Sequence, residues 1–264
     1  ARSNQKGRPV GQTDPIEVGD APAQATLTLP ATGRVQVAIG GDDFAYEARE
    51  GLPCRVTVQA GPAADIHAGV LMRFFSPDGG GVFRLPPGSY TLTAARGYEY
   101  EMLRQDVEVA AGQTATFAGT LVRSVHSEGW VAADFHMHGE ASADATIPIE
   151  HRLVTLAAVG LERMPMTDHD TITDADWRLA ALGLDGWLRL TAGVEVSPVG
   201  KHTNAYPVTP RADKPVYYGT AIAKGYAEDG SFLGAMTFPE IWDQMRSDFG
   251  AGILQINHPR DGQG

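Results

Sequence analysis

The sequence predicts a multidomain chain of two structural classes, with an antiparallel β-sandwich ahead of an α/β domain. Short alternating or β-branched runs, separated by Gly- and Pro-rich turns, fill residues 25–126. Strands then alternate with helices in residues 127–264, which is typical of a parallel sheet with crossover helices. A short apolar run at the start of this second part carries Asp134, His136 and His138 at alternate positions, so a strand there would place all three on one face.

The composition is that of an acidic globular protein. The chain has 264 residues and a net charge of −11, from 21 Lys and Arg against 32 Asp and Glu. We expect no nucleic-acid partner, because phosphate backbones are bound mainly by basic patches. We also expect no membrane partner, since no run approaches the ~18 apolar residues of a membrane span. The start at Ala1 leaves the localisation unknown, with a lean towards a periplasmic or secreted protein.

Cys54 is the only cysteine in the chain. An internal disulfide and a thiolate zinc site are therefore excluded. Any metal bound here must use His, Asp and Glu side chains.

Residues 1–24 are polar, rich in Gly and Pro and without periodicity, so we expect an extended arm. The runs that follow it are expected to form the sandwich, because they are short, rich in β-branched residues and bounded by turn signals. The expected strands are 26–29, 34–39, 55–59, 70–75, 90–93, 106–109 and 114–117.

In the second part, helices are expected where apolar residues recur at helical spacing behind a start signal. Thr237-Phe-Pro-Glu240, for example, reads as a capping box with Pro in the first turn. The long stretch 209–236, rich in Gly and Tyr, is expected to be an insertion or lid. The expected helices are 146–159, 173–182 and 238–249, and the expected strands are 131–139, 161–166, 188–196, 201–206 and 252–257.

Histidines and acidic residues recur where these expected strands end. In α/β folds the C-terminal ends of parallel strands converge, and functional groups gather there. A single histidine at such a place is more often a satisfied structural residue. Five of the eight histidines are placed this way, however, and imidazole is the commonest protein metal ligand, so we expect a polynuclear metal site. The residues concerned are His136, His138, His169, Glu195, His202 and His258.

Four stretches carry these residues in order: Asp134-Phe-His-Met-His138, Thr167-Asp-His-Asp170, Gly193-Val-Glu-Val-Ser197 and Asn257-His-Pro259. They resemble the successive motifs of the PHP (polymerase and histidinol phosphatase) domain over residues 130–264. More narrowly, Leu85-Pro-Pro-Gly-Ser-Tyr90 in the sandwich and the junction Gly129-Trp-Val-Ala-Ala-Asp134 are similar to the carbaryl-hydrolase group of that superfamily. The resemblance implies a distorted PHP-type (β/α)7 barrel holding two or three divalent metal ions, usually zinc, manganese or iron.

The resemblance also implies a set of metal ligands. His136 and His138 would bind one ion together with Glu195, which would bridge to a second ion. His202 and His258 would hold that second ion, and Asp144 and His169 match the ligands of a third.

One element of the family pattern is missing after His258. PHP domains normally end with an Asp-x-His element on a last strand, and Asp261 does not replace it because no histidine follows at the required spacing. We therefore expect a barrel that is incomplete at its C-terminus, and a second polypeptide segment that completes it. The oligomeric state is not readable from the sequence.

The expected function is metal-dependent hydrolysis of a small-molecule ester, first of all a phosphoester, by attack of a metal-bound hydroxide. Asp134, Asp168 and Asp170 would orient the imidazoles or relay protons, as carboxylate partners of metal-bound histidines do. Arg260, with Lys201, is a cationic candidate for an anionic substrate oxygen.

Two other functions remain open at this point. One is hydrolysis of a carbamate or carboxylic ester, as the carbaryl-hydrolase resemblance implies. The other is a non-catalytic binding module with a degenerate metal site, which the missing Asp-x-His favours. The retained histidines disfavour the binding module, because burying ionisable groups without a charge partner or a metal costs free energy of folding.

Overall fold

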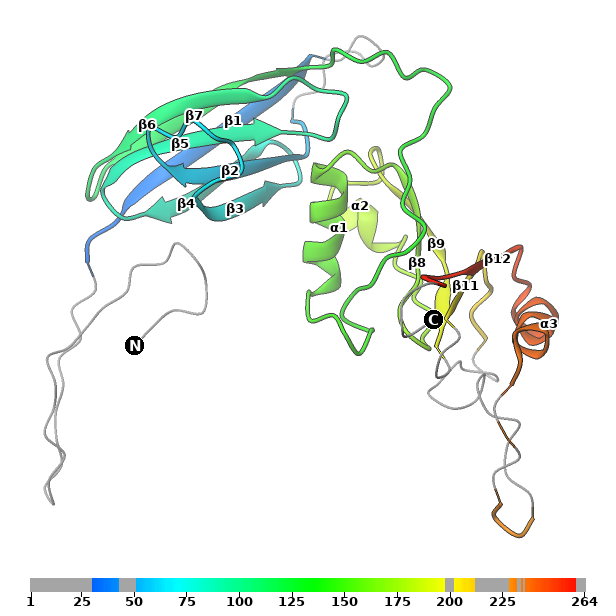
Figure 1. The fold of residues 1–264 in the computed structure, drawn as a ribbon. Coiled ribbons are helices and arrows are strands. Elements are labelled where there is room, and N and C mark those ends of the chain that lie inside the picture. Colours follow the sequence, from blue (N-terminus) through cyan, green and yellow to red (C-terminus); the bar gives the residue numbers. More distant parts are fainter. Residues whose placement is uncertain are drawn as a thin grey trace, which may run out of the picture. The chain divides into compact units, whose positions relative to one another are not determined.

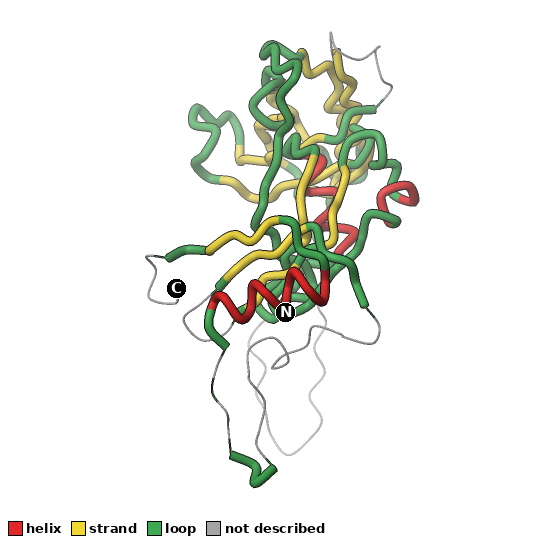
Figure 2. Tube along the Cα trace, turned by 90° about the vertical axis from the view of Figure 1, so that its right-hand side faces the viewer, coloured by secondary structure: helices red, strands yellow, loops and turns green. Residues whose placement is uncertain are grey.

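The computed structural model describes residues 30–42, 51–197, 202–211, 228–231, 234 and 236–259. The chain divides into two compact units, Ala1–Glu128 with Ala158–Gly160, and Gly129–Ala157 with Leu161–Gly264. Strands run through both units, whereas the described helices all follow residue 148 (Figure 1). Figure 2 shows the helices in red and the strands in yellow. The described residues include three helices.

One sheet of the first unit has the strand order β4-β1-β7. Val35, Val37 and Ile39 of β1 are buried and alternate with exposed or half-buried residues, as in a strand that turns one face to a core. β7 shows the same alternation around the fully buried Phe117. The strands are β1 (Gly33–Asp42), β4 (Gly80–Leu85) and β7 (Thr114–Val122).

The other sheet of this unit has the order β3-β2-β5-β6, with antiparallel pairing throughout. Its two central strands have buried residues on both faces, and the loop that follows β2 contacts one of these faces at Gln59. The Gln59 side-chain amide donates to the carbonyls of Asp65 and Ala68 at 2.6 and 2.5 Å, which holds that loop in place. The strands are β2 (Cys54–Ala60), β3 (Val70–Ser76), β5 (Gly88–Ala95) and β6 (Leu103–Val109).

The expectation of a wholly antiparallel sandwich is wrong, since β1 and β7 pair in parallel from Arg34↔Thr114 to Asp42↔Val122. Alternation of buried and exposed residues is the same for parallel and antiparallel partners, so the sequence pattern does not distinguish them. β4 was not expected, because its first residues belong to the Gly-rich stretch that reads as a turn. The expected first strand, 26–29, and the expected arm, 1–24, lie outside the described residues.

Cys54 lies at the start of β2 and is fully buried. Burial raises the pKa of its thiol to about 12, although the nearby Arg96 acts to lower it. We expect the native protein to resist alkylation by iodoacetamide up to pH values well above the ordinary thiol pKa, because the thiolate is the reactive form. Mass spectrometry should show modification of Cys54 only after denaturation; labelling of the native protein near pH 9 would contradict this.

In the second unit, α1 (Ile149–Ala158) packs against a two-stranded parallel sheet. Its apolar side chains at Ile149, Leu153, Leu156 and Ala157 follow helical spacing and are all buried. The Glu140 carboxylate accepts the free N–H of Ile149 at 3.2 Å, which satisfies one donor at the helix start. The sheet joins β8 (Arg163–Met166) to β9 (Arg189–Ala192), and the short α2 (Arg178–Ala181) belongs to the same core.

The rest of the second unit is an antiparallel sheet of order β10-β11-β12 with α3 against one face. Its strands are β10 (Val194–Val196), β11 (Thr203–Tyr206) and β12 (Ile253–Ile256), and the helix is α3 (Phe238–Phe249). Val194, Val196 and Ala205 are buried together with Ile241 and Met245 of α3. Alternation along the strands therefore turns the intervening residues to the opposite face.

The start of α3 confirms the capping signal predicted from the sequence. The Thr237 amide and hydroxyl both donate to the Glu240 carboxylate, at 2.7 and 2.8 Å. Gly250 ends the helix in the left-handed conformation, with φ of 67°. The helix bounds agree with the expected 238–249.

The expected (β/α)7 barrel is wrong. The described residues of the second unit form one parallel pair and one antiparallel three-stranded sheet, and these do not close into a barrel. The decisive difference is the expected strand 188–196, which splits at Gly193 into β9 and β10 in two different sheets. As a result the candidate ligands do not all lie at the C-terminal ends of parallel strands.

Two other elements also differ from expectation. Residues 131–139 form no strand and make only an isolated parallel bridge, Ala133↔Arg163. The expected helix 173–182 shortens to α2, because Thr173 instead bridges to Gly193 and its hydroxyl donates to Asp168. Most of the expected insertion 209–236 lies outside the described residues.

Gly193 permits the close backbone approach that divides β9 from β10. A Cβ at this position would lie 2.7 Å from the carbonyl oxygen of Met166 and 3.3 Å from that of Ala205. We expect Gly193→Ala to destabilise the protein by roughly 1–3 kcal/mol, because backbone atoms cannot move aside cheaply. Urea denaturation checks this. Gly40→Ala is the control, because a Cβ at Gly40 would meet nothing within 4 Å and its φ is not positive, so little loss of stability is expected there. A Gly193→Ala protein as stable as the wild type would contradict the close approach.

Candidate metal centre

Glu195 is the centre of the candidate site. It lies in the middle of β10, where its neighbours Val194 and Val196 face α3, so its own side chain points to the other face of the sheet. The side chain is 0% exposed. A buried carboxylate needs several partners to offset the loss of its hydration, and both oxygens of Glu195 have them.

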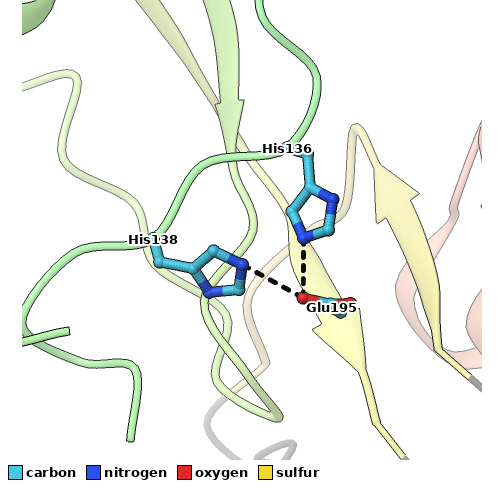
Figure 3. A group of neighbouring side chains, drawn as sticks. All are labelled: His136, His138 and Glu195. Atoms are coloured by element: carbon cyan, nitrogen blue, oxygen red, sulfur yellow. Dashed lines mark hydrogen bonds and ion pairs between the residues drawn. The ribbon is translucent and has the colours of Figure 1, made fainter. Parts of the chain in front are cut away.

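Three imidazoles face one oxygen of this carboxylate. His136 Nε2 lies 2.9 Å from Glu195 Oε2, and His138 Nε2 lies 3.1 Å from the same atom (Figure 3). His169 Nδ1 follows at 3.5 Å. One oxygen is therefore shared by side chains from two loops that are some thirty residues apart in the sequence.

Two further imidazoles and an amide face the second oxygen. His202 Nδ1 lies 3.1 Å from Glu195 Oε1, and His258 Nε2 lies 3.4 Å from it. The Asn257 side-chain amide donates to the same oxygen at 2.8 Å and to Asn204 Oδ1 at 2.7 Å. Asn257 thereby fixes the rotation of the carboxylate about its last bond.

The five imidazole rings form a closed circuit around the Glu195 carboxylate. Neighbouring rings have centroid distances of 4.7–5.9 Å, and each ring has two neighbours in the circuit. In order, the rings are His136, His138, His169, His202, His258 and again His136. Five of the eight histidines of the chain are thus gathered at one point.

A second carboxylate, Asp144, lies at the edge of this circuit. Its Oδ1 is 3.6 Å from His138 Nδ1 and its Oδ2 is 3.6 Å from His169 Nε2. The Ser142 hydroxyl donates to Asp144 Oδ1 at 2.7 Å. Asp144 is the most exposed of the seven expected ligands, which leaves this side of the cluster open to solvent.

Backbone hydrogen bonds bring the ligand-bearing segments together. The segment with His136 and His138 runs beside the end of β8, where Thr167 N–H donates to the Met137 carbonyl at 2.8 Å. The loop after β8 then pairs with β10, since His169 and Glu195 form a parallel bridge. Met137, which alternates with the two histidines, is buried in the core beneath α1.

The three aspartates expected near the ligands each accept a backbone N–H of a ligand-bearing loop. Asp134 Oδ1 accepts from His136 at 3.0 Å, Asp168 Oδ1 from Gly139 at 2.5 Å, and Asp170 Oδ1 from Ser197 at 2.9 Å. Asp168 and Asp170 are buried. Their hydrogen bonds hold together loops that are distant in sequence.

The charges of the cluster shift several pKa values. Burial alone would raise the pKa of Glu195, but hydrogen bonds from His136 and Asn257, together with the nearby His138 imidazole, outweigh it and hold this pKa far below its usual range. The hydrogen bond to Glu195 raises the pKa of His136, against the opposing effect of burial. Burial raises the pKa of Asp170, although the Ser197 amide acts to lower it.

The residues fit a bound divalent cation. The His/Glu and His/Asp groups that could hold one are His136, His138 and Glu195; His138, Asp144 and His169; and His169, Glu195 and His202. Two donors on one ion with bonds of ~2.1 Å lie ~3.0–3.4 Å apart in six- or four-coordinate geometry. The 2.9 and 3.1 Å contacts of Glu195 are close to this spacing. The Nδ1 atom of His258 is buried and has no hydrogen-bond partner among the described residues, so no hydrogen bond prevents it from acting as a metal ligand.

The structure therefore brings six of the seven expected ligands into direct contact with one another around Glu195, and Asp144 joins them through His138 and His169. Arg260 and Lys201 lie outside the described residues. Sequence reasoning missed Ser142 and Ser197 and assigned no role to Asn257. Their positions within or beside the ligand motifs were the only available signal.

No helix in the described part of the chain is long and apolar enough to cross a membrane. No family model and no curated protein matches the sequence. Among solved structures, the minor pilin GBS52 of Streptococcus agalactiae aligns with 13% identity and a TM-score of 0.29, over 40% of this chain and 55% of that one. The Bacillus anthracis TIE protein aligns with 13% identity and a TM-score of 0.26, over 41% of this chain and 19% of that one. Similarities this low carry no functional argument.

Proposed function

We propose that this protein is a metal-dependent hydrolase that cleaves an ester bond, with a phosphoester as the first candidate. The observation that carries the proposal is the closed circuit of five imidazoles around the buried Glu195 carboxylate. Imidazole and carboxylate donors without thiolate suit zinc, manganese and iron. Support also comes from the sequence, because the four motifs follow one another in the order that resembles that of PHP hydrolases. This similarity of order does not depend on the chain forming a barrel.

In this proposal, two or three divalent ions share the cluster. Glu195 would be a ligand together with His136 and His138, and also together with His202 and His258. Asp144 and His169 would hold a further ion on the side that is open to solvent. When bound, such ions supply Lewis-acid activation of water and stabilise negative charge that develops on oxygen.

The chain's own residues prepare the site. The Asn257 amide holds the Glu195 carboxylate in one orientation, and Asn204 in turn donates to the Phe135 carbonyl at 2.8 Å. Asp134 and Asp168 hold the backbone on both sides of the His136 and His138 pair. Donor atoms that are fixed in advance lose little entropy when they bind a cation or a substrate.

A carbamate or carboxylic ester is the second candidate, and an aromatic pair favours it. Phe135 stands between Asp134 and His136 in the chain, is 48% exposed and stacks on Tyr206 with a centroid distance of 5.7 Å. Such an exposed ring beside the ligands suits an aryl group better than a phosphate, because it offers apolar contact and no positive charge.

Metal content and activity on one sample test the proposal. The protein is expected to bind about two to three zinc or manganese ions, measured by elemental analysis after dialysis against trace metal. It is then assayed with a phosphodiester and an aryl carbamate, each before EDTA treatment, after it, and after metal is restored. Cleavage that EDTA abolishes and metal restores supports the hydrolase, and the preferred compound decides between the two substrate classes.

Two outcomes would overturn it. Binding of less than one ion per chain would show that the cluster is not a metal centre. Full metal occupancy without cleavage of either compound would favour the binding module instead.

A further inference from the structure

Ser142 lies where three of the expected ligands meet. It is 4% exposed, and its hydroxyl oxygen lies 2.7 Å from Asp144 Oδ1, 2.9 Å from His138 Nδ1 and 3.1 Å from the backbone nitrogen of His169. A hydroxyl has one hydrogen to donate and two lone pairs to accept with. Three contacts therefore use its full capacity.

The direction of each of these hydrogen bonds follows from the partners. A carboxylate only accepts, so the Ser142 hydrogen goes to Asp144. The backbone nitrogen of His169 only donates. His138 Nδ1 must then also donate to Ser142, which places the proton of the neutral imidazole on Nδ1 and leaves Nε2 with a free lone pair.

That free lone pair does not face a donor. His138 Nε2 lies 3.1 Å from Glu195 Oε2, which is also an acceptor. Two acceptors at this distance repel each other unless a cation lies between them or beside them. The hydrogen bonds of Ser142 thus prepare His138 Nε2 to face a positive charge.

Ser197 gives His169 the same tautomer. Its hydroxyl donates to the Glu195 carbonyl at 3.1 Å, and that carbonyl can only accept. The Ser197 oxygen lies 2.5 Å from His169 Nδ1, so this nitrogen is the donor. His169 Nε2 is then unprotonated, 3.6 Å from the Asp144 Oδ2 acceptor.

We propose that Ser142 and Ser197 are positioning residues that hold His138 and His169 as Nδ1–H tautomers, so that each presents an unprotonated Nε2 to a divalent cation. This inference rests on the metal centre proposed above and adds which nitrogen of each ring binds. Hydrogen bonds from the far nitrogen of a metal-bound imidazole commonly fix its tautomer in this way.

Two-bond ¹⁵N–¹H correlation spectra of the metal-free protein test the tautomers directly. Recorded at about pH 8, the spectra distinguish an imidazole that carries its proton on Nδ1 from one that carries it on Nε2. We expect Nδ1–H for both His138 and His169 in the wild type. A wild-type protein with the Nε2–H form at either ring would overturn the assignment for that ring.

The two alanine variants should differ from each other. In Ser142→Ala, the nearest acceptor for His138 becomes Glu195 Oε2, 3.1 Å from Nε2, whereas Asp144 is 3.6 Å from Nδ1, so the ring should change to Nε2–H. In Ser197→Ala, the acceptors near His169 are almost equidistant, at 3.5 Å from Nδ1 and 3.6 Å from Nε2, so a mixture of tautomers is expected. Unchanged spectra in both variants would contradict the role of the serines.

Zinc affinity, measured by competition with a chromophoric chelator, gives a second readout. Ser142→Ala should bind zinc about 10- to 100-fold more weakly, the usual effect of removing a hydrogen-bond partner of a metal ligand. Ser142→Thr and Ser197→Thr keep the hydroxyl and should retain the wild-type tautomers and affinity. Ser247→Ala, an exposed serine on α3, controls for the substitution itself. Wild-type affinity in Ser142→Ala would overturn the proposal.

The failure of this inference can be told apart from failure of the proposed function. Nδ1–H tautomers that depend on the serines, in a protein without hydrolase activity, would uphold the inference and reject the hydrolase. Metal-dependent hydrolysis by a protein in which His138 and His169 are Nε2–H tautomers would support the hydrolase and reject the inference.

Discussion

Replacing Glu195 by glutamine is expected to weaken metal binding by more than about 100-fold, beyond the usual effect of changing a neighbour of a ligand. The substitution keeps the size of the side chain but removes the negative charge that both sides of the cluster share. The imidazole nitrogens would then face an amide, which repels a cation through its NH₂ group. Hydrolytic activity should be lost together with the metal.

Thermal unfolding with and without zinc measures this effect. Zinc at about 100 times the wild-type dissociation constant should stabilise the wild type by ~2.7 kcal/mol and the Glu195→Gln protein by less than about 0.4 kcal/mol. Glu228→Gln, an exposed position in the same unit, is the matched control and should respond to zinc as the wild type does. A Glu195→Gln protein with wild-type zinc stabilisation would show that the carboxylate does not bind metal.

Replacing Phe117 by alanine is expected to cost about 3–5 kcal/mol of the free energy of unfolding, the largest effect on stability that we foresee. Phe117 is fully buried in the middle of β7, and the removal of its ring would leave a cavity in a closely packed core. All the candidate ligands lie in the other unit, so the folded variant should bind as many metal ions as the wild type.

Urea denaturation followed by circular dichroism gives the loss of stability, and elemental analysis of the folded protein gives the metal content. Val122→Ala lies on the same strand with its side chain 46% exposed and should change stability by less than about 0.5 kcal/mol. Equal effects of the two substitutions would mean that Phe117 does not fill the core. A loss of metal from folded Phe117→Ala would show that the two units depend on each other.

The strands of the first unit were largely predictable, because alternation of buried and exposed residues is a local property of each strand. The partner and direction of a strand are not local. The parallel pairing of β1 with β7 joins the first and last described strands of the unit, and their residue patterns would suit an antiparallel pair equally well. β4 escaped prediction because Gly80 and Gly81 belong to both the turn and the strand.

In the second unit, the sequence patterns predicted α1 and α3 well and the connections between strands poorly. The run 188–196 looks continuous, since nothing in a strand pattern marks Gly193 as a point where the chain leaves one sheet for another. Only the 2.7 Å approach of the Met166 carbonyl shows why a glycine is needed there. This change of sheet overturned the barrel that the motif resemblance implied.

The sequence by itself determined which residue types are available to bind a metal, since one cysteine excludes thiolate ligands and the histidines recur beside acidic residues. It did not determine that five imidazoles close a circuit around Glu195, or that Ser142 and Ser197 lie against the Nδ1 atoms of His138 and His169. Those contacts join segments that are up to 122 residues apart, as from His136 to His258. The tertiary structure decided them, because local side-chain alternation sets which face a residue occupies, whereas the long-range packing of strands and loops sets what that face meets.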